Sequence, residues 1–158
     1  KSFGWCIIEK DRSMRRFALS MALVMAGAMA YAQEVDTWVI FAKTRFEPKY
    51  DEKIGDYLYY PSFPEEIRKL EGKNVILEGF YVPFAPDGDD YIVISKFPMS
   101  QCFFCGGGGP ESVAEVKFAK PHRRFRVDDI ITVRGKLKLN QTDPDHLNFI
   151  LVDAELVD

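Results

Sequence analysis

The chain has 158 residues, of which 21 are Lys or Arg and 24 are Asp or Glu, and its formal net charge is −3. Binding to nucleic acid requires an excess of basic side chains that neutralise phosphates, so this balance argues against a nucleic-acid-binding protein. The length suffices for one domain with a hydrophobic core.

The start of the chain has the regions of a secretory signal peptide in their usual order. We expect translation from Met14, residues 14–32 as the signal peptide, and residues 1–13 as an upstream extension that is not translated. An Arg pair precedes an apolar stretch, and Ala-Tyr-Ala ends the segment as a cleavage signal. The apolar stretch is shorter than the roughly 20 residues of a membrane-spanning helix. We therefore expect an exported protein, periplasmic in a Gram-negative cell, without a stable membrane anchor after cleavage.

The sequence pattern in the first part of the mature chain predicts one strand and one short helix. The β-rich run DTWVIFA, residues 36–42, predicts a strand, whereas residues 43–59 are aromatic but aperiodic and predict irregular structure with at most one short strand. A short helix is expected over residues 64–70, because Ser62 suits the N-cap and Pro64 suits the first turn.

The remainder of the chain predicts strands separated by turns. Residues 130–140 show this most clearly, since apolar side chains alternate there with Thr, Arg and Lys. The other expected strands have β-branched or aromatic runs that end at Pro, Gly or Asp, and the turn APDGDD separates the first two. They are residues 73–84, 91–95, 114–119 and 147–157.

Two of these strands contain an internal glycine, Gly79 and Gly135. A glycine inside a strand usually marks a bulge or bend, and small closed barrels need bends to coil a few strands around a core. The sequence therefore predicts a mainly β fold: a small OB-like barrel, closed or partly open, with one short helix, formed by residues 33–158 as a single domain. An open β-sandwich is the alternative.

The stretch between the predicted strands 91–95 and 114–119 contains CFFC followed by four glycines. Three interpretations stay open for Cys102 and Cys105. In an oxidising compartment they form a disulfide. As thiolates they hold Zn²⁺, with His122 as a third ligand and nearby carboxylates such as Glu115 as further donors. As a redox motif they exchange thiols and disulfides, although GGGGP does not begin the regular helix that usually follows such a motif.

The loop around the cysteines is the predicted functional site. Glycines leave its backbone accessible, and binding residues are concentrated on loops. Two phenylalanines between the thiols offer an apolar lid or a contact for a partner. The predicted loop residues are Phe103, Phe104, Gly106, Gly107, Gly108, Gly109 and Glu115.

Three stretches together resemble an exported bacterial family of unknown function: LEGKNVILEGFYVPF, the cysteine loop ending in GPESVAEV, and VRGKLKLN with LNFILVDAELV. The resemblance covers roughly residues 64–157 and implies an OB-like β fold. It also implies genes for macrolide-exporter-type ABC transporters and zinc-responsive genes in the neighbourhood, and hence metal handling in the envelope. Many relatives carry a single Cys followed by His and prolines in this loop, where the present chain has CFFC and glycines.

Two functional hypotheses follow. The first is a non-enzymatic binding or accessory module of the periplasm that handles zinc together with an envelope transporter. The second is a thiol–disulfide oxidoreductase that uses the CFFC motif. No combination of serine, histidine and carboxylate has a recognisable catalytic context in the sequence.

Overall fold

The computed structural model describes residues 36–52, 55–84 and 91–157. The predicted signal peptide, the upstream extension and the turn at residues 85–90 lie outside the described residues. Within the described ranges, no helix is long and apolar enough to cross a membrane.

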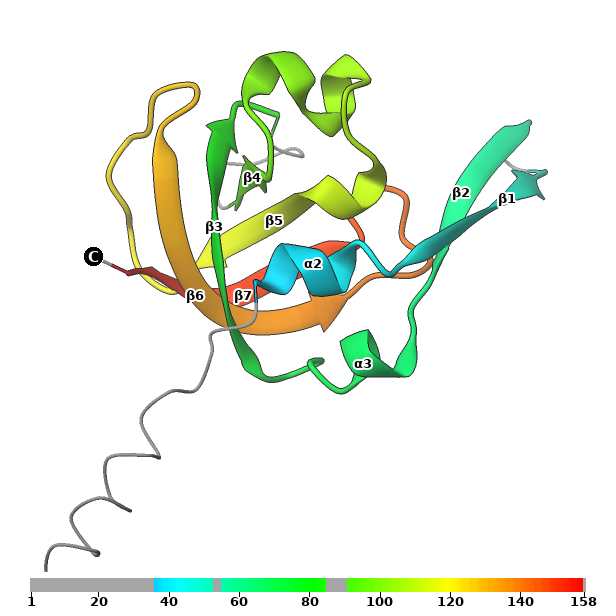
Figure 1. The fold of residues 1–158 in the computed structure, drawn as a ribbon, viewed down its shortest axis with the longest axis horizontal. Helices are drawn as coiled ribbons and strands as arrows, with labels where there is room; N and C mark the ends of the chain where they lie inside the picture. The colour runs from blue at the N-terminus through cyan, green and yellow to red at the C-terminus, as the bar shows by residue number, and fades with distance from the viewer. Residues whose placement is uncertain (1–35, 53–54, 85–90, 158) are drawn as a thin grey trace, which may run out of the picture. The chain divides into compact units, whose positions relative to one another are not determined.

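Five strands form a closed barrel, as the sequence predicts (Figure 1). The order around the barrel is β3-β4-β5-β7-β6, with β5 and β7 parallel and the other neighbours antiparallel. This mixed five-strand closure gives the chain an OB-like fold. The strands are β3 Asn74–Val82, β4 Tyr91–Ser95, β5 Val113–Phe118, β6 Ile130–Leu139 and β7 Phe149–Leu156.

Strand β6 shows why the alternating pattern predicted the barrel. Its apolar positions Ile131, Val133 and Leu137 are buried, while Arg134 and Lys136 between them are exposed. A strand with one face in a core and one in water requires this period of two. The prediction for residues 130–140 is confirmed.

The two strand glycines serve different purposes. At Gly135 the pairing of β6 with β7 shifts register between Arg134 and Lys136, which is the predicted irregularity. Gly79 instead lies in regular pairing with Ile131, so of the predicted bend or bulge there is no bulge in this pairing. Its position requires glycine because a Cβ would lie 2.6 Å from the backbone oxygen of Ser95 on β4.

The strand predicted at residues 36–42 is wrong, because this segment forms helix α2, Thr37–Phe41. Asp36 caps the helix by accepting a hydrogen bond from the Trp38 backbone N–H at 2.9 Å. Trp38 Nε1 donates to the Glu78 carbonyl at 2.7 Å, and Thr37 Oγ1 donates to the Ile76 carbonyl. These bonds to β3 hold the helix against the barrel and outweigh the β propensity of the run.

Helix α3, Glu65–Arg68, matches the predicted short helix, although it begins one residue after Pro64, which is its N-cap in place of Ser62. Together with α2 it makes two short α-helices within the described ranges, where the sequence predicted one. Residues 43–59 are less irregular than predicted. They contain β1, Arg45–Asp51, which pairs with β2, Asp56–Ser62, in a separate two-stranded sheet.

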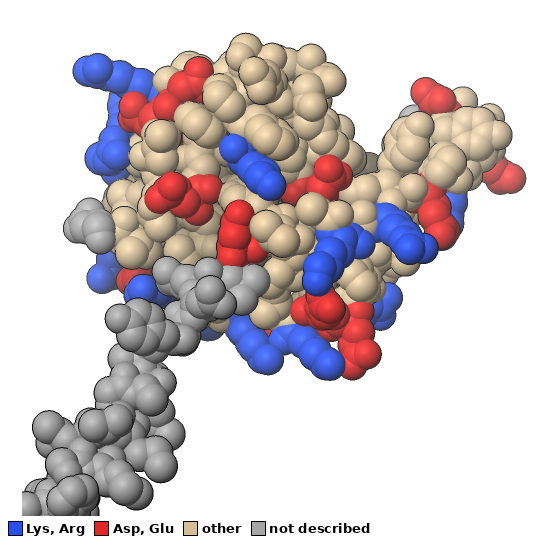
Figure 2. Space-filling view, in the orientation of Figure 1, with Lys and Arg blue, Asp and Glu red and all other residues tan. Residues whose placement is uncertain are grey.

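The main core lies inside the barrel and under the two helices. Phe41 of α2 stacks on Phe149 of β7 with ring centroids 3.8 Å apart, and Phe63 meets the same ring edge-on. A second, smaller cluster joins Val82, Val93, Val113 and Cys102, and it anchors the cysteine loop. On the face in Figure 2, Lys and Arg side chains are interspersed with Asp and Glu, so this face carries no extended basic surface.

Candidate functional site

The cysteine loop, residues 96–112, connects β4 to β5 and contains three short 3₁₀ turns. They are η1 Met99–Gln101, η2 Phe103–Cys105 and η3 Pro110–Ser112. Pro98 and Pro110 stand at the starts of two of these turns, and the backbone N–H of Met99 donates to Asp128 Oδ1 at 2.6 Å. The loop is therefore organised by local turns and by a hydrogen bond to Asp128, which is distant in the sequence.

Two of the four loop glycines are required by the backbone. Gly106 has φ = 81°, a left-handed conformation that L side chains rarely adopt. At Gly107 a Cβ would lie 2.5 Å from the Gln101 carbonyl oxygen, where the chain folds back on itself. The Gly107 N–H donates to the Cys102 carbonyl in this fold-back, at 3.2 Å. The glycine run thus shapes a tight turn around the cysteines.

Cys102 and Cys105 lie side by side and are both free thiols in the structure. Cys102 is fully buried in the smaller core cluster, whereas Cys105 is exposed. A hydrogen bond between the two side chains raises the pKa of the Cys105 thiol, and desolvation and the Cys102 charge raise it further. Since the thiolate is the reactive form, the accessible thiol is a weaker nucleophile at neutral pH than an ordinary cysteine.

Replacing Cys102 with alanine is expected to speed the alkylation of Cys105 by iodoacetamide at neutral pH. The variant removes the hydrogen bond and the charge that favour the protonated Cys105 thiol, so the thiolate fraction at a given pH rises. Mass spectrometry of alkylation rates across a pH series should show the midpoint moving to lower pH. Cys102→Ser keeps a hydrogen-bonding group and should move it less. Superimposable curves for the wild type and Cys102→Ala would contradict the assignment.

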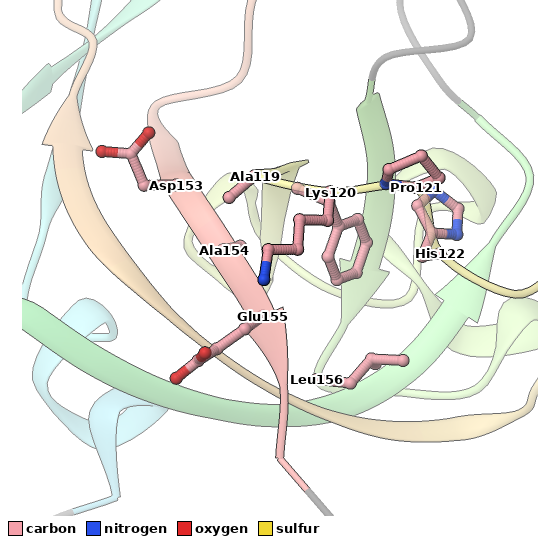
Figure 3. A pocket seen from close by; sticks show the side chains of 9 residues that line it. Ala119, Lys120, Pro121, His122, Asp153, Ala154, Glu155 and Leu156 are labelled. Carbon is pink, nitrogen blue, oxygen red and sulfur yellow. The ribbon is translucent and has the colours of Figure 1, made fainter.

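His122, the predicted third metal ligand, lies on the segment that follows β5. Its ring stacks on Phe125, with centroids 5.1 Å apart, and contacts Phe118 at 4.4 Å. Figure 3 shows it beside Lys120 and Pro121, at a hollow of about 240 Å³ bordered by the end of β7. His122 is therefore part of an aromatic stack.

The structure does not assemble the predicted zinc ligands. Among the described residues, no group of three or more His, Cys, Asp or Glu side chains is placed to hold a metal ion. The thiol pair supplies two donors, while His122 belongs to the aromatic stack and Glu115 is fully buried with other partners. A closed structural zinc site needs about four ligands. The fit of this chain's own residues to zinc is therefore incomplete.

The phenylalanines of CFFC border two different hollows. The Phe104 hollow has a volume of about 300 Å³ and is lined by Phe84, Phe104, Glu115, Pro144, Asp145, His146 and Leu147. The Phe103 hollow has about 290 Å³ and lies between β2, Phe103, Pro110 and the β6–β7 loop, residues 140–148. Pro144, His146 and Leu147 border both hollows, so the two hollows adjoin each other at the β6–β7 loop. Phe104 remains 40% exposed.

Glu115, predicted as a loop residue, lies on β5, and the sequence does not predict its partner, His146. Glu115 Oε2 lies 2.9 Å from His146 Nδ1, and Oε1 accepts from the Leu147 backbone N–H at 2.5 Å. Glu115 on β5 is a neighbour of Ile150 on β7 in the parallel pairing, which carries the β6–β7 loop to the carboxylate. A charged residue at a core position of a strand was the available signal, because fully buried carboxylates need partners.

Comparison with known proteins leaves the chain without an assigned family: no family model, no curated protein and no solved structure matches it. What the geometry establishes is a small closed β-barrel with a cysteine pair, two adjoining hollows and a buried carboxylate that holds a histidine.

Proposed function

We propose that this protein is a non-enzymatic binding module, and that its binding surface consists of the cysteine loop and the β6–β7 loop. One observation carries the proposal: the adjacent residues Phe103 and Phe104 border two hollows, and both hollows are also lined by His146 and Leu147 of the β6–β7 loop. Partly exposed aromatic rings beside hollows are typical of binding surfaces, since they bury a large area on contact. In OB folds the loop between the fourth and fifth strands, here the β6–β7 loop, is one of the loops that bind ligands.

The finer proposal is export to the periplasm and zinc handling together with an envelope transporter. It is supported by the signal-peptide pattern and by the resemblance of the strand and loop sequences to an exported bacterial family. Zinc on this surface would use the two thiols, with the remaining ligands supplied by a partner, because the described residues of the chain complete no site.

A thiol–disulfide oxidoreductase is the second candidate, favoured by the adjacent thiols with one of them exposed. Two features favour the binding module over it. The raised pKa of Cys105 lowers the thiolate fraction that attacks a disulfide. The turn η2 also has only three residues and ends at Gly106, so no regular helix lowers the thiol pKa.

Site-specific photo-crosslinking in cells that express the protein tests the binding module. With p-benzoylphenylalanine in place of Phe104, we expect a discrete adduct with one partner, because the side chain faces the proposed surface. The control carries the same group in place of Val127, which is 52% exposed and borders neither hollow. It should give no such adduct. The same adduct pattern at both positions, or none at 104, would contradict the proposal. Zinc analysis of the purified adduct tests the metal: a zinc-free adduct contradicts the zinc assignment alone.

A further inference from the structure

The hydrogen bonds of Glu115 fix the orientation of His146. The carboxylate is fully buried, and its two oxygens bind the Leu147 N–H and the His146 ring nitrogen Nδ1. A carboxylate can only accept, so Nδ1 carries the proton of that bond. In the neutral ring the other nitrogen, Nε2, is then an acceptor, and among the described residues it has no hydrogen-bond partner. The side chain is 32% exposed and borders the Phe104 hollow.

The walls of the Phe104 hollow are aromatic and acidic. The rings of Phe84 and Phe104 lie 4.6 Å apart and are tilted by 34°, and they are 38% and 40% exposed. Asp145 adds an exposed carboxylate next to His146. None of the described residues that line the hollow is Lys or Arg. Lys117 lies over the Tyr91 ring, which contacts His146 from β4, but it does not border the hollow.

We propose that the Phe104 hollow binds a protonated primary amine carried on an apolar stem, an inference that rests on the proposed binding function. The ammonium N–H groups donate to His146 Nε2 and to the Asp145 carboxylate. The aromatic faces of Phe84 and Phe104 attract the cation and bury the methylene groups next to it. A carboxylate or phosphate ligand would meet two carboxylates and no Lys or Arg in the lining, so the charge of the hollow selects against anions.

The amine has two possible sources with the same chemistry: the lysine side chain of a protein partner, or a free small amine. Both present an ammonium group at the end of an aliphatic stem. A lysine would insert its ammonium group into the hollow and keep its backbone outside. A free diamine would insert one ammonium group and leave the second at the rim. The test below separates them by comparing a lysine derivative with diaminobutane.

The experiment is an NMR titration of the full ¹⁵N-labelled protein at about pH 8. The probes are butylammonium, N-acetyl-lysine methylamide, 1,4-diaminobutane and, as the anionic counterpart, butyrate. We expect saturable shifts of Phe104 and of residues 144–147 with the amines, at millimolar concentration for such small ligands. No saturable shift is expected with butyrate. Tighter binding of the lysine derivative identifies a protein lysine, and tighter binding of the diamine identifies a free amine.

Asp145→Asn should weaken amine binding about fivefold, because it removes one charge at close range. Phe104→Leu should also weaken it, since leucine keeps an apolar wall but lacks the ring. The matched control is Asp153→Asn: it removes the same charge at a site bordering the separate His122 hollow, and asparagine tolerates the positive φ of 52° there. It should leave the affinity unchanged.

Three results would overturn the inference: saturation by butyrate in place of the amines, no saturable shift with any amine, or equal weakening by the control. Each of them leaves the binding module itself standing if the Phe104 crosslink is still specific. Loss of the specific crosslink together with intact amine binding would contradict the wider function and keep the amine site.

Discussion

Gly79→Ala is expected to destabilise the protein by about 2–3 kcal/mol, the cost of overpacking a tightly packed position. Gly79 lies on β3 where pairing with β6 ends and pairing with β4 begins. A Cβ there would meet the Ser95 carbonyl oxygen at 2.6 Å and the Trp38 ring at 3.4 Å. The oxygen belongs to the backbone of strand β4, which is paired on both sides, so it moves only if the barrel shifts. Urea denaturation of both proteins measures the effect.

Gly135→Ala is the matched control for this prediction. Its Cβ would lie 3.1 Å from the Cβ atoms of Ala154 and Leu151 and from the Val152 oxygen, so small adjustments relieve most of the overlap. We expect a cost of about 1 kcal/mol, smaller than at Gly79. Neither glycine has a positive φ, so the difference comes from crowding and not from backbone strain. Equal stability of Gly79→Ala and the wild type would show that β4 does not approach β3 this closely.

Glu115→Ala is expected to destabilise the protein by about 2–4 kcal/mol. The variant leaves the Leu147 N–H and His146 Nδ1 without their acceptor and opens a cavity in the barrel wall. The β6–β7 loop should also loosen, because those two bonds attach it to β5. Chemical denaturation measures the stability, and hydrogen exchange at residues 146 and 147 measures the opening of the loop.

Two other variants separate the hydrogen bonds of Glu115 from its volume. Glu115→Gln keeps the size and one acceptor oxygen for the Leu147 N–H, so a loss of about 1 kcal/mol is expected. Glu78→Ala removes an exposed glutamate from β3, where a weak bond from Thr132 is lost, and should cost less than about 0.5 kcal/mol. If Glu115→Ala is no more destabilising than Glu78→Ala, the buried carboxylate does not hold the loop.

The amine site and the loop attachment share this carboxylate. Glu115 aims the His146 ring, so its loss would be expected to lower amine affinity through the ring's orientation as well as to loosen the loop. For this reason the amine test uses Asp145 and Phe104, which touch the hollow without holding the fold. Stability and binding can then be measured on different residues of the same surface.

Much of the barrel could be predicted because the pattern of apolar and polar residues in each strand indicates which side chains are buried. The alternation in β6 and the apolar run of β4 reflect which side of each residue faces the core, and that information is local in the chain. Helix α2 could not be predicted in the same way. Its residues favour strands, and the bonds that make it a helix come from the carbonyls of Ile76 and Glu78, about forty residues later.

In the proposed binding surface, too, some features follow from the local sequence and others only from the tertiary structure. By itself the sequence determined that two cysteines and two phenylalanines share a short glycine-rich loop, because residues three apart in a turn are necessarily close. Only the tertiary structure decided which other groups join them. It put His122 in an aromatic stack and paired Glu115 with His146, thirty-one residues away. Strand pairing decides such neighbours, because the parallel register of β5 and β7 places the β6–β7 loop beside Glu115 of β5. No local sequence pattern specifies that register.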